Sequence, residues 1–187
     1  MFETSLEDLV RSLRSNRRNE RQFVRKALND CHLELQSTTD VHTKSQALAK
    51  LVYLRMLGAD VSWAGFYVLE VMSDPSVRFK RIGYLAAARM LSADEDFIIL
   101  ATNLIKKDLV SDRPAILLIV LSSVTEFVNG FLAREILSEI VGLLNHAHPA
   151  VRKKSMVVLN IILMNFADLM ATFLVKLKER LGDKDTG

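Results

Sequence analysis

A segment that recurs along the chain constrains its fold more than any other feature. The stretch from Asp74 to Lys80 (DPSVRFK) matches the stretch from His148 to Lys154 (HPAVRKK), and Asp112-Arg113-Pro114 lies between them. With Asp40 as a first start, positions 40, 74, 112 and 148 follow one another at steps of 34, 38 and 36 residues. A nearly constant step of this size is typical of an array of structural repeats.

Amphipathic helices fill the intervals between these starts. Phe97, Leu100, Ala101 and Leu104, for example, have the spacing i, i+3, i+4, i+7 of one helix face. The 187 residues include only 7 Gly and 3 Pro, which leaves few places for β-turns. Two helices per repeat predict an all-α fold: a right-handed α-solenoid of HEAT/armadillo-like helical pairs, with about ten helices. Such a stack presents long surfaces and no enclosed pocket.

Capping and breaking signals predict where the helices lie. Thr4 and Glu7 have the spacing of a capping box for a first helix that ends near Ser15. Gly58 is a candidate C-cap, and Ser62 is a candidate N-cap. Four further helices are expected over 20–36, 44–57, 62–72 and 75–91. Three more are expected to begin near 94, 114 and 149. Apolar stripes over 133–144 and 170–181 predict the remaining two.

Composition excludes several classes of protein. The chain is 50% hydrophobic and 25% charged, so it is not a disordered tail. The net charge of +3 is too small for a general polyanion binder. The single cysteine, Cys31, cannot form an intramolecular disulfide, which fits a reducing compartment. We expect no secretory signal and no membrane span, because the longest uncharged runs are too short.

No pattern of catalytic or metal-binding residues stands out. The glycines are scattered and form no phosphate loop. His146 and His148 are expected in a solvated loop, and Cys31 is expected to be a buried small side chain. Asp94 to Asp96 fit a helix N-terminus, and the helix with Trp63, Phe66, Tyr67 and Val68 is expected to pack into the core. We therefore expect no enzyme activity, cofactor or metal.

A basic cluster near the N-terminus is the main candidate for binding. Positions 11 to 26 contain seven basic residues and one acidic residue, Glu20. One interpretation is an anionic partner, such as lipid headgroups, an acidic peptide or a phosphate backbone. The other is a solvated face with ion pairs to Glu7, Asp8 or Asp30. The basic residues are Arg11, Arg14, Arg17, Arg18, Arg21, Arg25 and Lys26.

Four blocks in one order also resemble a known family. They are Ala49–Ala64 (AKLVYLRMLGADVSWA), Phe79–Ala87 (FKRIGYLAA), Thr102–Leu109 (TNLIKKDL) and Val151–Lys154 (VRKK). They resemble the start of the adaptins, the large chains of clathrin-type adaptor complexes, and within that family they are most similar to the delta-adaptins. The resemblance covers nearly the whole chain and implies one trunk domain over 1–187, truncated at its C-terminal end.

The resemblance implies a non-catalytic scaffold for cargo sorting. Such a chain binds a sigma subunit, joins beta-type and medium chains in a heterotetramer, and docks on the cytosolic face of Golgi or endosomal membranes through an Arf-family GTPase. It also implies recognition of acidic dileucine cargo peptides with the sigma chain. Under this view the protein is cytoplasmic, makes peripheral membrane contact and binds no nucleic acid.

The resemblance also assigns roles to individual residues. Arg14 corresponds to the arginine that contacts the acidic side of a dileucine signal in alpha-adaptin. Lys44 is the one lysine retained where alpha-adaptin has three for a phosphoinositide, so it is a weak candidate for a lipid headgroup. The alternative hypothesis is a free-standing helical-repeat module that binds nucleic acid or another protein through Arg11 to Lys26.

Overall fold

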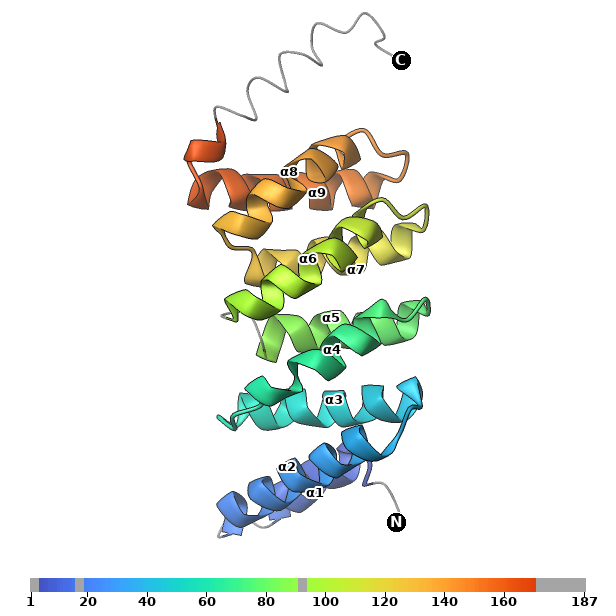
Figure 1. The fold of residues 1–187 in the computed structure, drawn as a ribbon, viewed down its shortest axis with the longest axis vertical. Coiled ribbons are helices and arrows are strands. Elements are labelled where there is room, and N and C mark those ends of the chain that lie inside the picture. The colour runs from blue at the N-terminus through green and yellow to red at the C-terminus, as the bar shows by residue number, and fades with distance from the viewer. Residues whose placement is uncertain (1–3, 16–18, 91–93, 171–187) are drawn as a thin grey trace, which may run out of the picture. The chain divides into compact units, whose positions relative to one another are not determined.

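The computed structural model describes residues 4–15, 19–90 and 94–170 of the chain, and within these ranges it is built from helices and loops (Figure 1). Every helix expected within them is present, so the all-α prediction is confirmed. The elements are α1 (Leu6–Ser15), α2 (Glu20–Ser37), α3 (Val41–Met56), the 3₁₀ helix η2 (Ser62–Ala64), α4 (Gly65–Ser73), α5 (Val77–Met90), α6 (Glu95–Leu109), α7 (Pro114–Phe127), α8 (Gly130–Leu143) and α9 (Pro149–Asn165). The stripe expected over 170–181 lies almost entirely outside the described residues.

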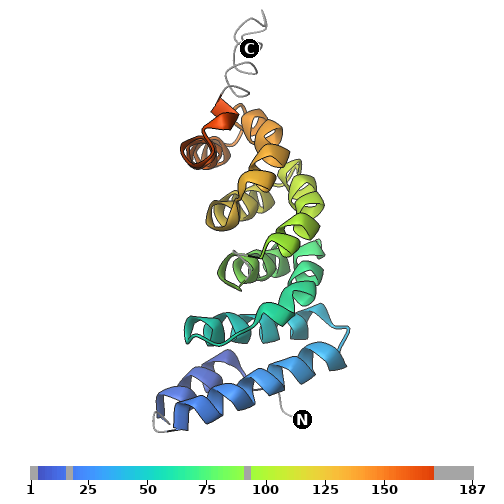
Figure 2. The same cartoon turned by 60° about the vertical axis from the view of Figure 1, so that its left-hand side comes forward.

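The chain divides into two compact units, Met1–Phe97 and Ile98–Gly187. In the first unit α3 packs against α2, α4 and α5, and α1 packs against α2 and α3. In the second unit α9 packs against α7 and α8, and Figure 2 shows α7 and α9 in one layer with α8 in another. Helices that start one repeat apart therefore lie side by side within each unit, as the solenoid hypothesis requires.

The recurring segment marks the start of a helix each time. The Asp40 carboxylate accepts hydrogen bonds from the backbone N–H groups of His42 and Thr43 at the start of α3. The Thr43 N–H and hydroxyl hold the pKa of the Asp40 carboxyl below its usual range. His148 occupies the equivalent place before α9, where its Nδ1 accepts a hydrogen bond from the Ala150 N–H. Different side chains thus perform the same N-terminal capping.

Basic side chains close the turn between one repeat and the next. The Lys80 ammonium is buried and donates to the carbonyl of Met72, in the last turn of α4, at 2.8 Å. The Arg152 guanidinium donates to the carbonyls of His146 and Ala147, after α8, at 2.7 and 2.8 Å. Carbonyls at and just beyond a helix C-terminus have no N–H partner within the helix. The Lys80 and Arg152 side chains therefore supply the missing hydrogen-bond donors.

Two of the expected caps are wrong. The first helix is capped by Ser5, whose hydroxyl accepts from the Asp8 N–H and donates to the Asp8 carboxylate, so the cap is one residue later than the predicted Thr4. Ser62 is the first residue of η2, and its N–H is held by the Asp60 carboxylate at 3.1 Å. The Gly58 prediction is confirmed, since Gly58 follows α3 with φ +90°.

One glycine is required by close packing. A Cβ at Gly83 in α5 would lie 2.7 Å from the backbone nitrogen of Met72 and 2.9 Å from its Cα, so α4 and α5 approach each other through this position. A Cβ at Gly142, in α8, would meet no atom within 4 Å. The two positions therefore provide a matched pair for substitution by alanine.

We expect Gly83→Ala to lower the stability of the protein by about 1–3 kcal/mol, because the backbones of α4 and α5 must separate. Gly142→Ala is the control, and we expect it to be neutral or to stabilise by about 0.5–1 kcal/mol through helix propensity. Thermal unfolding followed by circular dichroism measures both. Equal melting temperatures for the two variants would contradict the close approach.

Candidate binding surface

The described members of the basic cluster lie on the first two helices and are exposed. Arg11 and Arg14 project from α1, and Arg21, Arg25 and Lys26 project from α2. The spacings i, i+3 and i, i+4 put the α1 pair on one face and Arg21 with Arg25 on another. Arg17 and Arg18 belong to the same predicted cluster but lie outside the described residues.

Helix α1 carries an open depression between two arginines. It has a volume of about 730 Å³, and Leu6 and Val10 supply its apolar lining. Arg11 and Arg14 lie at its polar side, together with Glu7 and Ser15. A depression of this kind offers apolar contact next to cationic donors.

The expected ion pairs of the cluster are only partly made. Arg11 lies 3.6 Å from the Asp8 carboxylate, but the two side chains are 78% and 56% exposed, so the pair contributes little. No ion pair within the described ranges involves Arg14, whose guanidinium is exposed on α1. Arg14 therefore keeps its fork of N–H donors available for a carboxylate or phosphate.

Lys44, the predicted lipid-headgroup candidate, forms an ion pair between α3 and α4. Its side chain is 8% exposed, and its Nζ lies 2.6 Å from both carboxylate oxygens of Glu70 on α4. The ammonium also lies 5.8 Å from the centre of the Tyr67 ring, within the range of a cation–π contact. The Glu70 carboxylate is therefore the partner of this ammonium within the described residues, and a lipid-headgroup contact of Lys44 stays a prediction.

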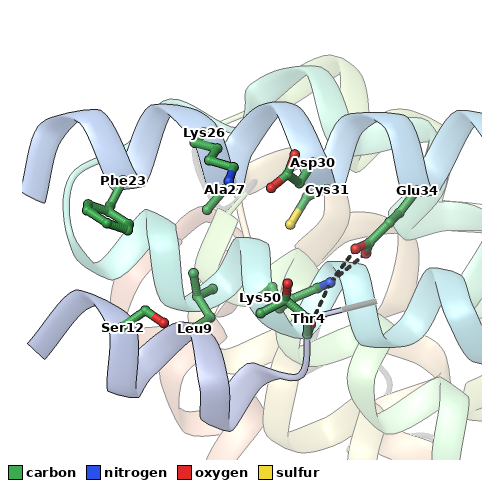
Figure 3. Close-up of a pocket in the computed structure, with 10 residues that line it drawn as sticks. All are labelled: Thr4, Leu9, Ser12, Phe23, Lys26, Ala27, Asp30, Cys31, Glu34 and Lys50. Carbon is green, nitrogen blue, oxygen red and sulfur yellow. Dashed lines mark hydrogen bonds and ion pairs between the residues drawn. The ribbon is translucent and has the colours of Figure 1, made fainter. Parts of the chain in front are cut away.

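A second buried lysine links α3 to α2 and to the start of α1 (Figure 3). The Lys50 Nζ donates to Glu34 at 2.7 and 2.5 Å and to the carbonyl of Thr4 at 3.1 Å. The Lys50 side chain is 5% exposed. Sequence reasoning missed both lysine pairs, because the acids lie 16 and 26 residues from their lysines. The available signal for Lys50 was its place in the otherwise apolar run 47–54, whereas Lys44 lies among polar residues and had no such signal.

Cys31 is buried, as expected. It lies beside a cavity of about 130 Å³ between α1, α2 and α3, with 1% of its surface exposed. Burial, partly offset by the Lys50 charge, raises the pKa of the thiol to about 12. A thiol with such a pKa is protonated at neutral pH and is a poor nucleophile, so this cysteine is structural.

The aromatic residues near η2 differ from the expectation. Phe66 is 77% exposed and Trp63 is 37% exposed, whereas Val68 is fully buried. Trp63 makes an edge-to-face contact with His32 of α2, with ring centres 4.5 Å apart. The predicted core packing of Phe66 is therefore wrong, because the buried face of α4 is the one that carries Val68, Val71 and Met72.

The other polar candidates have structural roles. His146 Nδ1 accepts from the His148 N–H at 3.0 Å, in the loop between α8 and α9. Asp94 accepts from the Phe97 N–H at 2.9 Å and caps α6. Within the described ranges, no group of three or more His, Cys, Asp or Glu side chains could hold a metal ion. No described helix is both long and apolar enough to cross a membrane.

The stacked helical pairs define an α-solenoid, and the candidate binding residues are exposed on its first two helices. A family model described as the adaptin N-terminal region matches residues 20–187. The chain therefore belongs to the adaptin N-terminal family, and the family resemblance of the four sequence blocks is confirmed.

Curated relatives match along the whole chain. The AP-3 complex subunit delta of Schizosaccharomyces pombe is 38% identical over 186 residues, which are 100% of this chain and 22% of the relative. The AP-3 complex subunit delta-1 of Bos taurus is 36% identical over 187 residues, 100% of this chain and 15% of the relative. The predicted similarity to delta-adaptins is confirmed, and the chain spans about a fifth of the length of these relatives.

A structural comparison agrees with these relatives. A structure described as a homology model of the full-length AP-3 complex in an intermediate open conformation matches with a TM-score of 0.66 and 36% identity. The match covers 78% of this chain and 26% of the other chain. The fold of the described helices is therefore the fold of part of an adaptor-complex chain.

The Lys44–Glu70 pair can be tested by a double-mutant cycle of Lys44→Met and Glu70→Gln. We expect a coupling energy of about 1–2 kcal/mol in chemical unfolding, because the lysine is buried while the glutamate is partly solvated. Lys26→Met, at an exposed site, is the control and should leave stability within about 0.5 kcal/mol. Weaker binding of phosphoinositide vesicles by a folded Lys44→Met variant would support Lys44 as a lipid contact, and unchanged binding would contradict that prediction.

Proposed function

We propose that this chain is part of a non-catalytic scaffold subunit of a heterotetrameric adaptor complex. The full-length similarity to delta subunits of AP-3 complexes carries this proposal. The subunit acts in vesicle-mediated protein transport from the Golgi or endosomes to lysosome- or vacuole-type compartments. It works at the cytosolic face of the membrane, where an Arf-family GTPase recruits it.

The partners follow from the same proposal. The chain binds a sigma subunit through its helical surfaces, and the complete subunit joins beta-type and medium chains. Co-expression of this chain with a matching sigma subunit is expected to give a 1:1 complex that persists in moderate salt, because apolar burial is insensitive to screening. Failure to form a complex with several different sigma chains would count against the adaptor assignment.

The depression on α1 is the proposed contact for an acidic dileucine peptide. Leu6 and Val10 provide apolar surface, and Arg11 and Arg14 can donate to the carboxylate of the signal. Arg17, Arg18 and Arg21 extend the basic sequence from α1 into α2 and add long-range attraction. Arg14 is the central residue because none of the described acids pairs with it.

In the complex with sigma, we expect Arg14→Ala to weaken binding of an acidic dileucine peptide by about tenfold, the value of one charged hydrogen bond. Assembly with sigma should be unchanged. Arg81→Ala, which removes an exposed arginine from α5, is the matched control and should bind the peptide normally. Isothermal titration calorimetry measures peptide affinity, and equal affinity for the two variants would remove Arg14 from the site.

The alternative function is a helical-repeat module that binds nucleic acid through the basic cluster, and the exposure of Arg21, Arg25 and Lys26 favours testing it. Its affinity would fall steeply with salt, because phosphate contacts release counterions. Titration of the protein into labelled RNA and DNA at two salt concentrations tests this alternative. Nucleic-acid binding that weakens steeply at the higher salt would support it, whereas the adaptor function requires no nucleic-acid binding at either salt concentration.

A further inference from the structure

Helix α1 has a small attachment to the rest of the first unit. It is 10 residues long, and its buried side chains are Leu9 and Leu13. A helix of this length is not stable alone in water, so it depends on docking. Across the start of α1, the Lys50 ammonium donates a hydrogen bond to the Thr4 carbonyl at 3.1 Å.

The surface under α1 is incompletely filled. The cavity of about 130 Å³ lies between α1 and α2, with Leu9 and Ser12 on one side and Phe23 and Ala27 on the other. Figure 3 shows the Cys31 sulfur directed into the space between these helices. Because this space is partly open to solvent and is not filled by side chains, α1 makes fewer contacts with α2 here than a close-packed helix pair would.

The rest of the unit keeps its contacts without α1. Helix α3 packs against α2, α4 and α5, none of which requires α1. Lys50 retains both bonds to Glu34, and water can replace the Thr4 carbonyl. The family match begins at residue 20, so the array that it describes starts with α2.

We propose that α1 is a strap that undocks as a unit from α2 and α3 while the helices from α2 to α5 stay folded. Docking fixes Arg11 and Arg14 on α1 relative to Arg21 and Arg25 on α2, and undocking releases that arrangement. The strap thus controls whether the basic residues of the two helices act together. This inference is independent of the proposed adaptor function, because it rests on contacts within the first unit.

Cys31 provides a direct test, because it is the single cysteine of the chain and lies under α1. Iodoacetamide labelling of the native 187-residue protein is followed by mass spectrometry at increasing urea, below the unfolding transition. Undocking predicts a labelling rate with a shallow urea dependence, because little surface is exposed by the opening. A urea dependence equal to that of global unfolding would overturn the proposal.

Two variants separate local from global opening. We expect Leu13→Ala to raise the labelling rate of Cys31 by at least about tenfold, because it removes one of the two buried anchors of α1. Val68→Ala, a fully buried site on α4, should lower global stability and leave the labelling rate below the transition within about twofold. If the Cys31 labelling rate of both variants changed in proportion to their loss of global stability, the proposal that α1 undocks by itself would be contradicted.

Hydrogen exchange of the wild-type protein keeps the proposal testable if Leu13→Ala does not fold. The amides of α1 are expected to exchange at least about tenfold faster than the slowest amides of α2 and α3, because undocking breaks the α1 hydrogen bonds alone. Equal protection of all three helices would show that α1 opens only when the unit unfolds, and it would overturn the proposal.

Discussion

The burial of α3 on several sides is the constraint on which the first unit depends. Its neighbours α2, α4 and α5 cover most of its surface, so even Lys44 and Lys50 are buried. Each ammonium therefore needs a partner, since an unpaired buried charge costs several kcal/mol. Lys44 pairs with Glu70 of α4, and Lys50 pairs with Glu34 of α2. The two ion pairs fix α3 to two different neighbours and set which helices lie against it.

The same requirement explains why the repeats use basic residues near their turns. Carbonyls at and just beyond a helix C-terminus lack helical partners, and that of Met72 is also in a buried contact. Lys80 and Arg152 satisfy these carbonyls in the first and second units, respectively. A basic residue early in the first helix of a repeat is therefore part of the fold, even in a chain whose function is expected to involve anions.

Local patterns were enough to predict the helices, but not the surroundings of each side chain. The step between Asp74 and His148 and the 3.6-residue periodicity are properties of neighbouring residues, so they are visible in the sequence. The partner of Lys44 lies 26 residues away, and no local pattern reveals it. Phe66 was misassigned because several faces of α4 are apolar, and only the packing of α5 decides which of them is buried.

The sequence located the basic residues of the candidate site but not the surroundings of each side chain. Charge density alone located the basic cluster on α1 and α2, and Arg14 is exposed as a binding residue must be. Lys44 was a candidate through the family resemblance, and its pairing with Glu70 could not be read from the sequence because burial is a tertiary property. Helix α1 contributes both the exposed guanidiniums and the two leucines that hold it in place. Any change in the packing of Leu9 and Leu13 therefore changes where Arg11 and Arg14 lie, so the stability of this helix determines the geometry of the proposed binding surface.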